Sequence, residues 1–196
     1  MSAKSIGNLK KLKHLYIGNT QITRLPDGLE NLENLETLEI NIANLDLKDV
    51  VEKIKNLPRL TSLSICNQLS YPDNFCELVQ IKKLFIEQNY VLKIGEHKNL
   101  PIPENVTLLP NLEELYLTNN NQANRLPKSM HRLKNLKKLQ MYSTSIQSFP
   151  ESMHYLNQIQ STEGNLNKDV TSPFGILPIE KEKLIRWFPN AKIQIY

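Results

Sequence analysis

The sequence predicts an α/β solenoid, a fold in which similar strand-and-turn units stack on one another along the chain. Three features of the 196 residues support this prediction. An L-x-x-L-x-L motif recurs through most of the chain, its apolar positions alternate as in a strand with one buried face, and a proline-containing segment follows several copies. One such strand cannot bury its own apolar face, whereas stacked strands share a continuous core with their neighbours.

The repeat is clearest where two distant segments are aligned. Residues 12–26 and residues 136–150 match without a gap. The motif begins at Leu12, Leu35, Leu60, Ile81, Leu112 and Leu136. A further, degraded unit begins near Ile159, so the sequence contains about seven repeats.

These units resemble leucine-rich repeats of the L-x-x-L-x-L-x-x-N-x-L-x-x-L-P type, and the resemblance extends from Ile6 to about Asn167. The family implies a right-handed horseshoe with a curved parallel sheet on its concave side and short helices or 3₁₀ turns on its convex side. We expect residues 1–196 to form a single leucine-rich-repeat domain, with repeats over about 6–167 and a C-terminal cap over about 168–196.

The family places an asparagine after each strand, where its side chain satisfies backbone groups at the turn. In this sequence the slot holds Thr20, Ala43, Gln68, Asn89, Asn120 and Thr144. Only Asn89 and Asn120 match the family residue. Ala43 has no polar side chain, which predicts a looser turn in the second repeat.

Three repeats begin their second half with an apolar residue and a proline, at Leu25-Pro26, Leu126-Pro127 and Phe149-Pro150. Proline suits the first turn of a helix, so these segments predict brief helical or 3₁₀ turns on the convex side. Residues 47–56 of the second repeat instead predict a helix of two or more turns.

Residues 177–188 predict a helix with Pro178 at its start, and the alternating residues 191–196 predict a final strand. One face of this helix is expected to carry Ile179, Leu184, Trp187 and Phe188. Helix and strand together would cap the C-terminal end of the core. The N-terminal end has no comparable cap, because residues 5–9 match the second half of a repeat. Either the chain is truncated there, or something else covers the first strand.

The repeat that begins at Ile81 is longer than its neighbours, with the excess at residues 90–103. This insertion is either a tolerated surface loop or part of a binding face. Charge is also uneven: residues 27–52 carry eight acidic residues against Lys48 alone, whereas residues 125–138 carry only basic ones. The pattern fits an ordinary solvated surface, or a bipolar surface that orients a partner of complementary charge.

Several classes of partner and location are not expected. The net charge of +4 is mild and neither demands nor excludes a polyanionic partner, and no nucleic-acid partner is expected. No apolar stretch is long enough to cross a bilayer. The N-terminus lacks the basic start and apolar run of a signal peptide, which predicts a cytoplasmic protein. A chain from which a leader had been removed would look the same.

The sequence offers no support for catalysis. Cys66 has no histidine at a matching position in adjacent repeats to act as its base, and Cys66 and Cys76 do not form a disulfide framework. His131 and His154 occupy the same position of neighbouring repeats, which repetition explains better than metal binding does. With only 6 glycines, a phosphate-binding loop is not expected. We therefore expect no enzyme, no metal and no cofactor.

The outward positions of the predicted strands define a candidate binding face for a partner protein. The residues expected to contact the partner are His14, Tyr16, Glu39, Lys83, Phe85, Glu87, Glu114, Tyr116, Lys138, Gln140 and Tyr142. Phe85 and Tyr116 occupy the same slot in successive repeats, and Tyr142 lies one repeat further on. Such rings either anchor an interface or pack on one another as a stabilising ladder.

The function that the sequence favours is a non-enzymatic protein–protein interaction module, or scaffold, that binds its partner through the concave face. Two alternatives stay open. One is an inhibitor or immunity-type protein that neutralises a partner enzyme. The other is an architectural repeat protein with weak self-association through its uncapped N-terminal edge.

Overall fold

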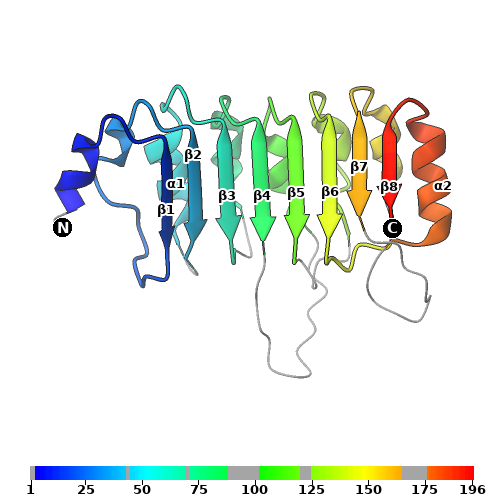
Figure 1. The fold of residues 1–196 in the computed structure, drawn as a ribbon, viewed down its shortest axis with the longest axis horizontal. Helices are drawn as coiled ribbons and strands as arrows, with labels where there is room; N and C mark the ends of the chain where they lie inside the picture. The colour runs from blue at the N-terminus through cyan, green and yellow to red at the C-terminus, as the bar shows by residue number, and fades with distance from the viewer. Residues whose placement is uncertain (1–2, 43–44, 69–70, 88–101, 120–124, 165–175) are drawn as a thin grey trace, which may run out of the picture.

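Eight parallel strands lie side by side in one sheet, in the order in which they occur along the chain (Figure 1). They are β1 (His14–Gly18), β2 (Thr37–Asn41), β3 (Ser62–Cys66), β4 (Lys83–Glu87), β5 (Glu114–Thr118), β6 (Lys138–Tyr142), β7 (Ser161–Gly164) and β8 (Lys192–Ile195). This computed structural model describes residues 3–42, 45–68, 71–87, 102–119, 125–164 and 176–196. Apart from residues 102 and 103, the insertion at 90–103 lies outside these ranges.

One short helix precedes β1, and each of the others connects two successive strands, most of them behind the sheet in Figure 1. They are η1 (Ala3–Asn8), η2 (Leu29–Asn31), α1 (Leu47–Ile54), η3 (Asp73–Glu77), η4 (Glu104–Leu108), η5 (Met130–Arg132), η6 (Glu151–Tyr155) and α2 (Pro178–Trp187), where η denotes a 3₁₀ helix. The predicted 3₁₀ turns are thus confirmed. Within the described ranges, neither α-helix combines the length and apolar character that a membrane span requires.

The strands form where the leucine motif predicts them, because alternate side chains of a strand point to opposite faces of the sheet. In β5, Leu115 and Leu117 are fully buried while the three residues between and beside them are not. Leu115 pairs with Leu84 of β4 and with Leu139 of β6, so the buried leucines form ladders that run from strand to strand. The other face of the sheet, which we call the open face, carries the outward side chains.

The turn after a strand depends on a residue that the motif did not single out. Asn19, Asn67, Asn119 and Ser143 directly follow β1, β3, β5 and β6 and have positive φ angles between 52° and 61°. Asparagine tolerates this left-handed conformation better than most residues. In that conformation the Asn67 N–H donates to the Glu87 carbonyl at 2.8 Å, which extends the ladder between strands.

The next residue is the slot where the family has asparagine. Gln68 is buried there, and its Nε2 donates to the Ile42 carbonyl of the preceding repeat at 2.5 Å. A glutamine therefore performs the role expected of the family residue. Thr144 is buried in the same slot, whereas Thr20 is exposed. The other three slot residues, Ala43, Asn89 and Asn120, lie outside the described ranges.

The longer helix predicted in the second repeat is confirmed as α1. The side chain of Asp46 accepts hydrogen bonds from the backbone N–H groups of Lys48 and Asp49 and caps its first turn. Leu47, Val50, Val51 and Ile54 are buried on the side that faces the core.

The helix and the strand predicted for the C-terminal cap are confirmed, but the predicted burial of one residue is wrong. Strand β8 pairs with β7, and α2 buries Leu184, with Phe188 buried directly after it. Trp187 is half-buried against the core. Ile179, however, is 64% exposed. Five residues span about 1.4 helical turns, so Ile179 cannot share the face of Leu184.

Candidate functional site: the open face of the sheet

The in-register pairing arranges the outward side chains of the open face in three rows across the strands. The first row is His14, Thr37, Ser62, Lys83, Glu114, Lys138, Ser161 and Lys192. The middle row is Tyr16, Glu39, Ser64, Phe85, Tyr116, Gln140, Glu163 and Gln194. The third row is Gly18, Asn41, Cys66, Glu87, Thr118 and Tyr142. Every residue predicted to contact a partner lies in one of these rows.

Phe85 and Tyr116 form a stacked pair in the middle row. Their ring centroids are 4.2 Å apart and their planes differ by 6°. Both side chains are half-buried. The expected packing of neighbouring rings is thus confirmed for this pair.

Tyr142 does not continue that stack. It pairs with Thr118 in the third row, because the residue of β6 opposite Tyr116 is Gln140. Tyr142 therefore lies on the same face as the stacked pair but outside the stack. Two residues along a strand return to the same face but move to the next row.

Charged groups surround the Tyr116 ring. Glu114 pairs with Lys83 at 2.9 Å and accepts a hydrogen bond from the Tyr116 hydroxyl. Lys138 lies 5.4 Å from the ring centroid and pairs with Glu163 at 3.3 Å. Burial, followed by the hydrogen bond to Glu114, raises the pKa of Tyr116. Burial by itself raises the pKa of Glu114, but the Tyr116 hydroxyl and Lys83 outweigh it and lower that pKa.

Ion pairs neutralise much of the charge asymmetry that the sequence suggested. Glu113, Lys82 and Lys137 each directly precede a strand. Glu113 pairs with Lys82 at 3.0 Å and with Lys137 at 2.6 Å. In the acidic segment, Asp27 pairs with Lys53 at 2.8 Å. Exposed pairs of this kind add little stability, but they reduce the net field of each segment. The arrangement favours the solvated-surface interpretation over the bipolar one.

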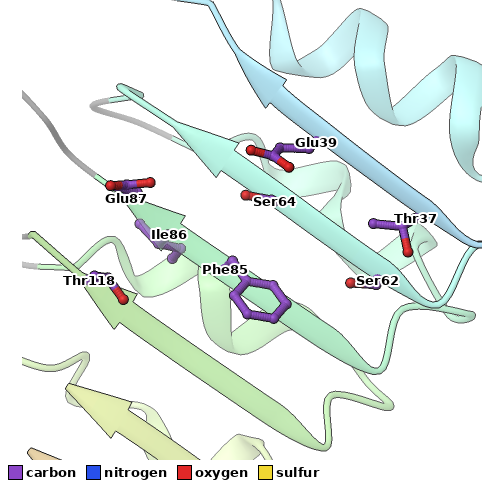
Figure 2. Close-up of a pocket in the computed structure, with 8 residues that line it drawn as sticks. All are labelled: Thr37, Glu39, Ser62, Ser64, Phe85, Ile86, Glu87 and Thr118. Carbon is purple, nitrogen blue, oxygen red and sulfur yellow. The ribbon is translucent and has the colours of Figure 1, made fainter. Parts of the chain in front are cut away.

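A hollow interrupts the open face between β2 and β5 (Figure 2). It encloses about 380 Å³ and is lined by Thr37, Glu39, Ser62, Ser64, Phe85, Ile86, Glu87 and Thr118. It forms because β3 carries the small side chains Ser62 and Ser64 between Glu39 on one side and Phe85 on the other. The sequence prediction named Glu39, Phe85 and Glu87 but missed the serines. Two small outward residues in one strand were the available signal.

The two carboxylates of the hollow differ in their contacts. Glu87 accepts hydrogen bonds from Asn119 Nδ2 at 2.8 Å and from Cys66 Sγ at 3.8 Å. Glu39 is exposed and makes no hydrogen bond or ion pair with any other described residue. Burial, and then the charges of Glu87 and Glu39, raise the pKa of the Cys66 thiol to about 11. The thiol is therefore protonated at neutral pH and is a poor nucleophile.

The histidines predicted to repeat do so on the convex side. His131 lies in η5 and His154 in η6, and His154 Nδ1 is 2.6 Å from the Glu151 carbonyl. In the part of the chain that the structure describes, no three His, Cys, Asp or Glu side chains gather in a way that could hold a metal ion. His97 lies outside the described ranges.

One segment of the chain matches a known sequence family. The family model described as Leucine Rich Repeat matches residues 11–32, the segment that contains β1 and η2. A comparison with curated proteins gave no match.

Several solved structures are similar to the fold. A leucine-rich-repeat protein of Leptospira interrogans has a TM-score of 0.41 at 19% identity, over 96% of this chain and 62% of that one. An internalin, InlF, of Listeria monocytogenes has a TM-score of 0.49 at 20% identity, over 97% of this chain and 58% of that one. The chain thus spans less than two thirds of the length of either structure.

The likeness that supports the fold is to the leucine-rich-repeat domain of the type III effector XopL. Its TM-score is 0.54 at 18% identity, over 97% of this chain and 71% of that one. The likeness agrees with the recurring motif, the match at residues 11–32 and the single parallel sheet. The chain therefore has the fold of a leucine-rich-repeat solenoid, and the family model itself matches residues 11–32.

Proposed function

We propose that this chain is a non-enzymatic module that binds a partner protein through the open face of its sheet. Leucine-rich-repeat solenoids commonly use such extended faces to bind proteins. The observation that carries the proposal is the hollow beside the stacked Phe85–Tyr116 pair, at the middle of the face. A pocket next to large rigid rings is the usual form of an interface hot spot.

The stacked pair suits the role of an anchor because its geometry is set before binding. Each ring already rests on the other, so a partner that covers them restricts few additional rotamers. Thr37, Glu39 and Ser62 provide polar groups beside the rings, as the rim of an interface requires. The residues named from the sequence are the proposed contact set.

The described side chains also favour binding over catalysis. Cys66 lies in β3 in the third row of the open face, whereas His14, the histidine of that face, lies in β1 in the first row. The raised pKa of the Cys66 thiol removes the thiolate that a cysteine nucleophile needs. A cytoplasmic location stays a prediction.

Site-specific photo-cross-linking would test this proposal. A photoreactive amino acid is placed at Gln140 on the open face or at Lys128 on the convex side, and each variant is irradiated with a partner isolated by affinity capture. We expect the partner to be cross-linked from position 140 and not from position 128. Cross-linking from position 128 alone would overturn the proposal.

A second candidate function is self-association through β1, and one observation favours it. Leu15 and Ile17 of β1 are only half-buried, whereas their counterparts Leu38 and Ile40 in β2 are fully buried. Tyr16 between them is 51% exposed. Light scattering during size-exclusion chromatography tests this candidate. A dimer that Tyr16→Glu converts to a monomer would support it, and a monomer at every concentration would remove it.

The inhibitor interpretation can be tested once a partner is isolated. If that partner is an enzyme, the wild-type chain should lower its activity in proportion to the fraction bound. Binding that leaves the activity unchanged would remove this interpretation while the proposed binding face would stand.

A further inference from the structure

We infer that the hollow over β2–β5 receives an arginine side chain of the partner, with its guanidinium between Glu39 and Glu87 and its methylene stem against Phe85. The inference deepens the proposed function and rests on it for the identity of the partner as a protein.

The shape of the hollow suits a long side chain with a planar head. Its volume of about 380 Å³ exceeds what a single methyl or hydroxyl group would fill. Phe85 supplies an apolar wall on the β4 side, and Ser62 and Ser64 line the strand between the two carboxylates (Figure 2). A methylene stem can pack on the ring while a polar head reaches the far end.

The charges around the hollow favour a cation. Glu39 lies in β2 and Glu87 in β4, so a group above β3 lies between two carboxylates. Lys83 of β4 lies opposite Ser62, at the edge of the hollow. Its Nζ pairs with Glu114 of β5 at 2.9 Å rather than with a carboxylate of the hollow. Burial is the main cause of the raised pKa of Cys66, and the charges of Glu87 and Glu39 raise it further.

Arginine fits this arrangement better than lysine. The guanidinium carries five N–H donors in a rigid plane, so one group can donate to both carboxylates and to a serine hydroxyl at once. An ammonium has three donors around one nitrogen and is more strongly hydrated, so its transfer from water is less favourable.

The test uses small probes, so it does not depend on the partner. The ¹⁵N-labelled chain is titrated with N-acetyl-arginine methylamide, with its uncharged citrulline analogue and with the lysine analogue. We expect saturable shifts at Ser62, Ser64 and Glu87 with the arginine probe, with a Kd about threefold to fivefold tighter than that of the lysine probe. The citrulline probe should give no saturation. Equal binding of citrulline would overturn the charge argument, and equal or tighter binding of lysine would overturn the choice of arginine.

Matched variants locate the site. Glu39→Gln removes one carboxylate without breaking any bond to another described residue and should weaken the arginine probe about threefold to fivefold. Glu33→Gln makes the same chemical change at an exposed residue outside the hollow and should leave the Kd unchanged. Ser64→Leu should fill the hollow and abolish the shifts, whereas Gln194→Leu, in the same row on β8, should not. Unchanged binding by Glu39→Gln or Ser64→Leu overturns the inference.

The outcomes separate this inference from the proposed function. If the arginine probe fails while the partner is cross-linked from position 140, the open face binds proteins but the hollow takes another group. If the probe binds while cross-linking occurs from position 128 alone, the hollow is a cation site and the proposed function is wrong.

Discussion

The Phe85 ring lies flat on the Tyr116 ring, with the two centroids 4.2 Å apart across adjacent strands. Stacked aromatic pairs contribute about 0.5–1.5 kcal/mol beyond the area they bury. A double-mutant cycle with Phe85→Leu and Tyr116→Leu, measured as free energies of unfolding in urea, should therefore show a coupling energy of about 0.5–1.5 kcal/mol.

The control for this cycle is Phe85→Leu combined with Tyr142→Leu. These residues lie in different rows on β4 and β6, so their effects should add to within about 0.5 kcal/mol. A coupling for Phe85 and Tyr116 as small as that of the control pair would show that the stacking adds no stability.

The buried leucine ladder should carry a large part of the stability. Leu115 and Leu139 are fully buried and pair directly across β5 and β6. Replacing either with alanine should lower the free energy of unfolding by about 2–5 kcal/mol, because each leaves a cavity between repeats. Gln140→Ala, on the outward face of β6, should change it by no more than about 0.5 kcal/mol. A loss below about 1 kcal/mol at both leucines would contradict the register.

The glutamine in the asparagine slot should be required for its turn. Gln68→Leu removes the donor to the Ile42 carbonyl and leaves that acceptor without its side-chain partner. We expect a loss of about 1–3 kcal/mol in chemical denaturation. Thr20→Val alters the same slot at an exposed position and should be nearly neutral. Similar effects of the two substitutions would contradict a stabilising role for the hydrogen bond between Gln68 and the Ile42 carbonyl.

The two thiols should differ in reactivity. Cys66 is buried with a pKa raised to about 11, whereas Cys76 is exposed in η3. In the native protein at neutral pH, a thiol reagent should modify Cys76 readily and Cys66 slowly. Cys76→Ser should therefore remove the fast phase of the reaction. Reducing agent should leave the melting temperature unchanged, and a drop in that temperature would reveal a disulfide.

The sequence predicted strand positions well because the buried leucines alternate with period two and repeat in every unit. The boundaries of β1 to β6 follow directly from that alternation. The prediction failed at Ile179, which is 64% exposed. That residue lies five positions before Leu184, so the helical period itself separates the two faces.

The candidate site could be predicted only in part, for a physical reason. Which side chains face outward follows from alternation within one strand, so the contact set could be written down. The hollow depends on side-chain size across neighbouring strands, with Ser64 small between Glu39 and Phe85. The pairing of Lys83 with Glu114 also required the register between repeats. A single repeat contains neither kind of information.

We propose that a partner protein binds the open face of the sheet. The most direct measurement is the Kd of the isolated partner for the wild-type chain, for Tyr116→Ala and for Lys128→Ala, by titration calorimetry on variants whose folding has been checked by thermal unfolding. Loss of an aromatic anchor typically costs at least 2 kcal/mol, so Tyr116→Ala should weaken binding by roughly thirtyfold. Lys128 is exposed on the convex side, so Lys128→Ala should leave the Kd within about twofold. A large loss for Lys128→Ala together with an unchanged Kd for Tyr116→Ala would contradict binding through the open face.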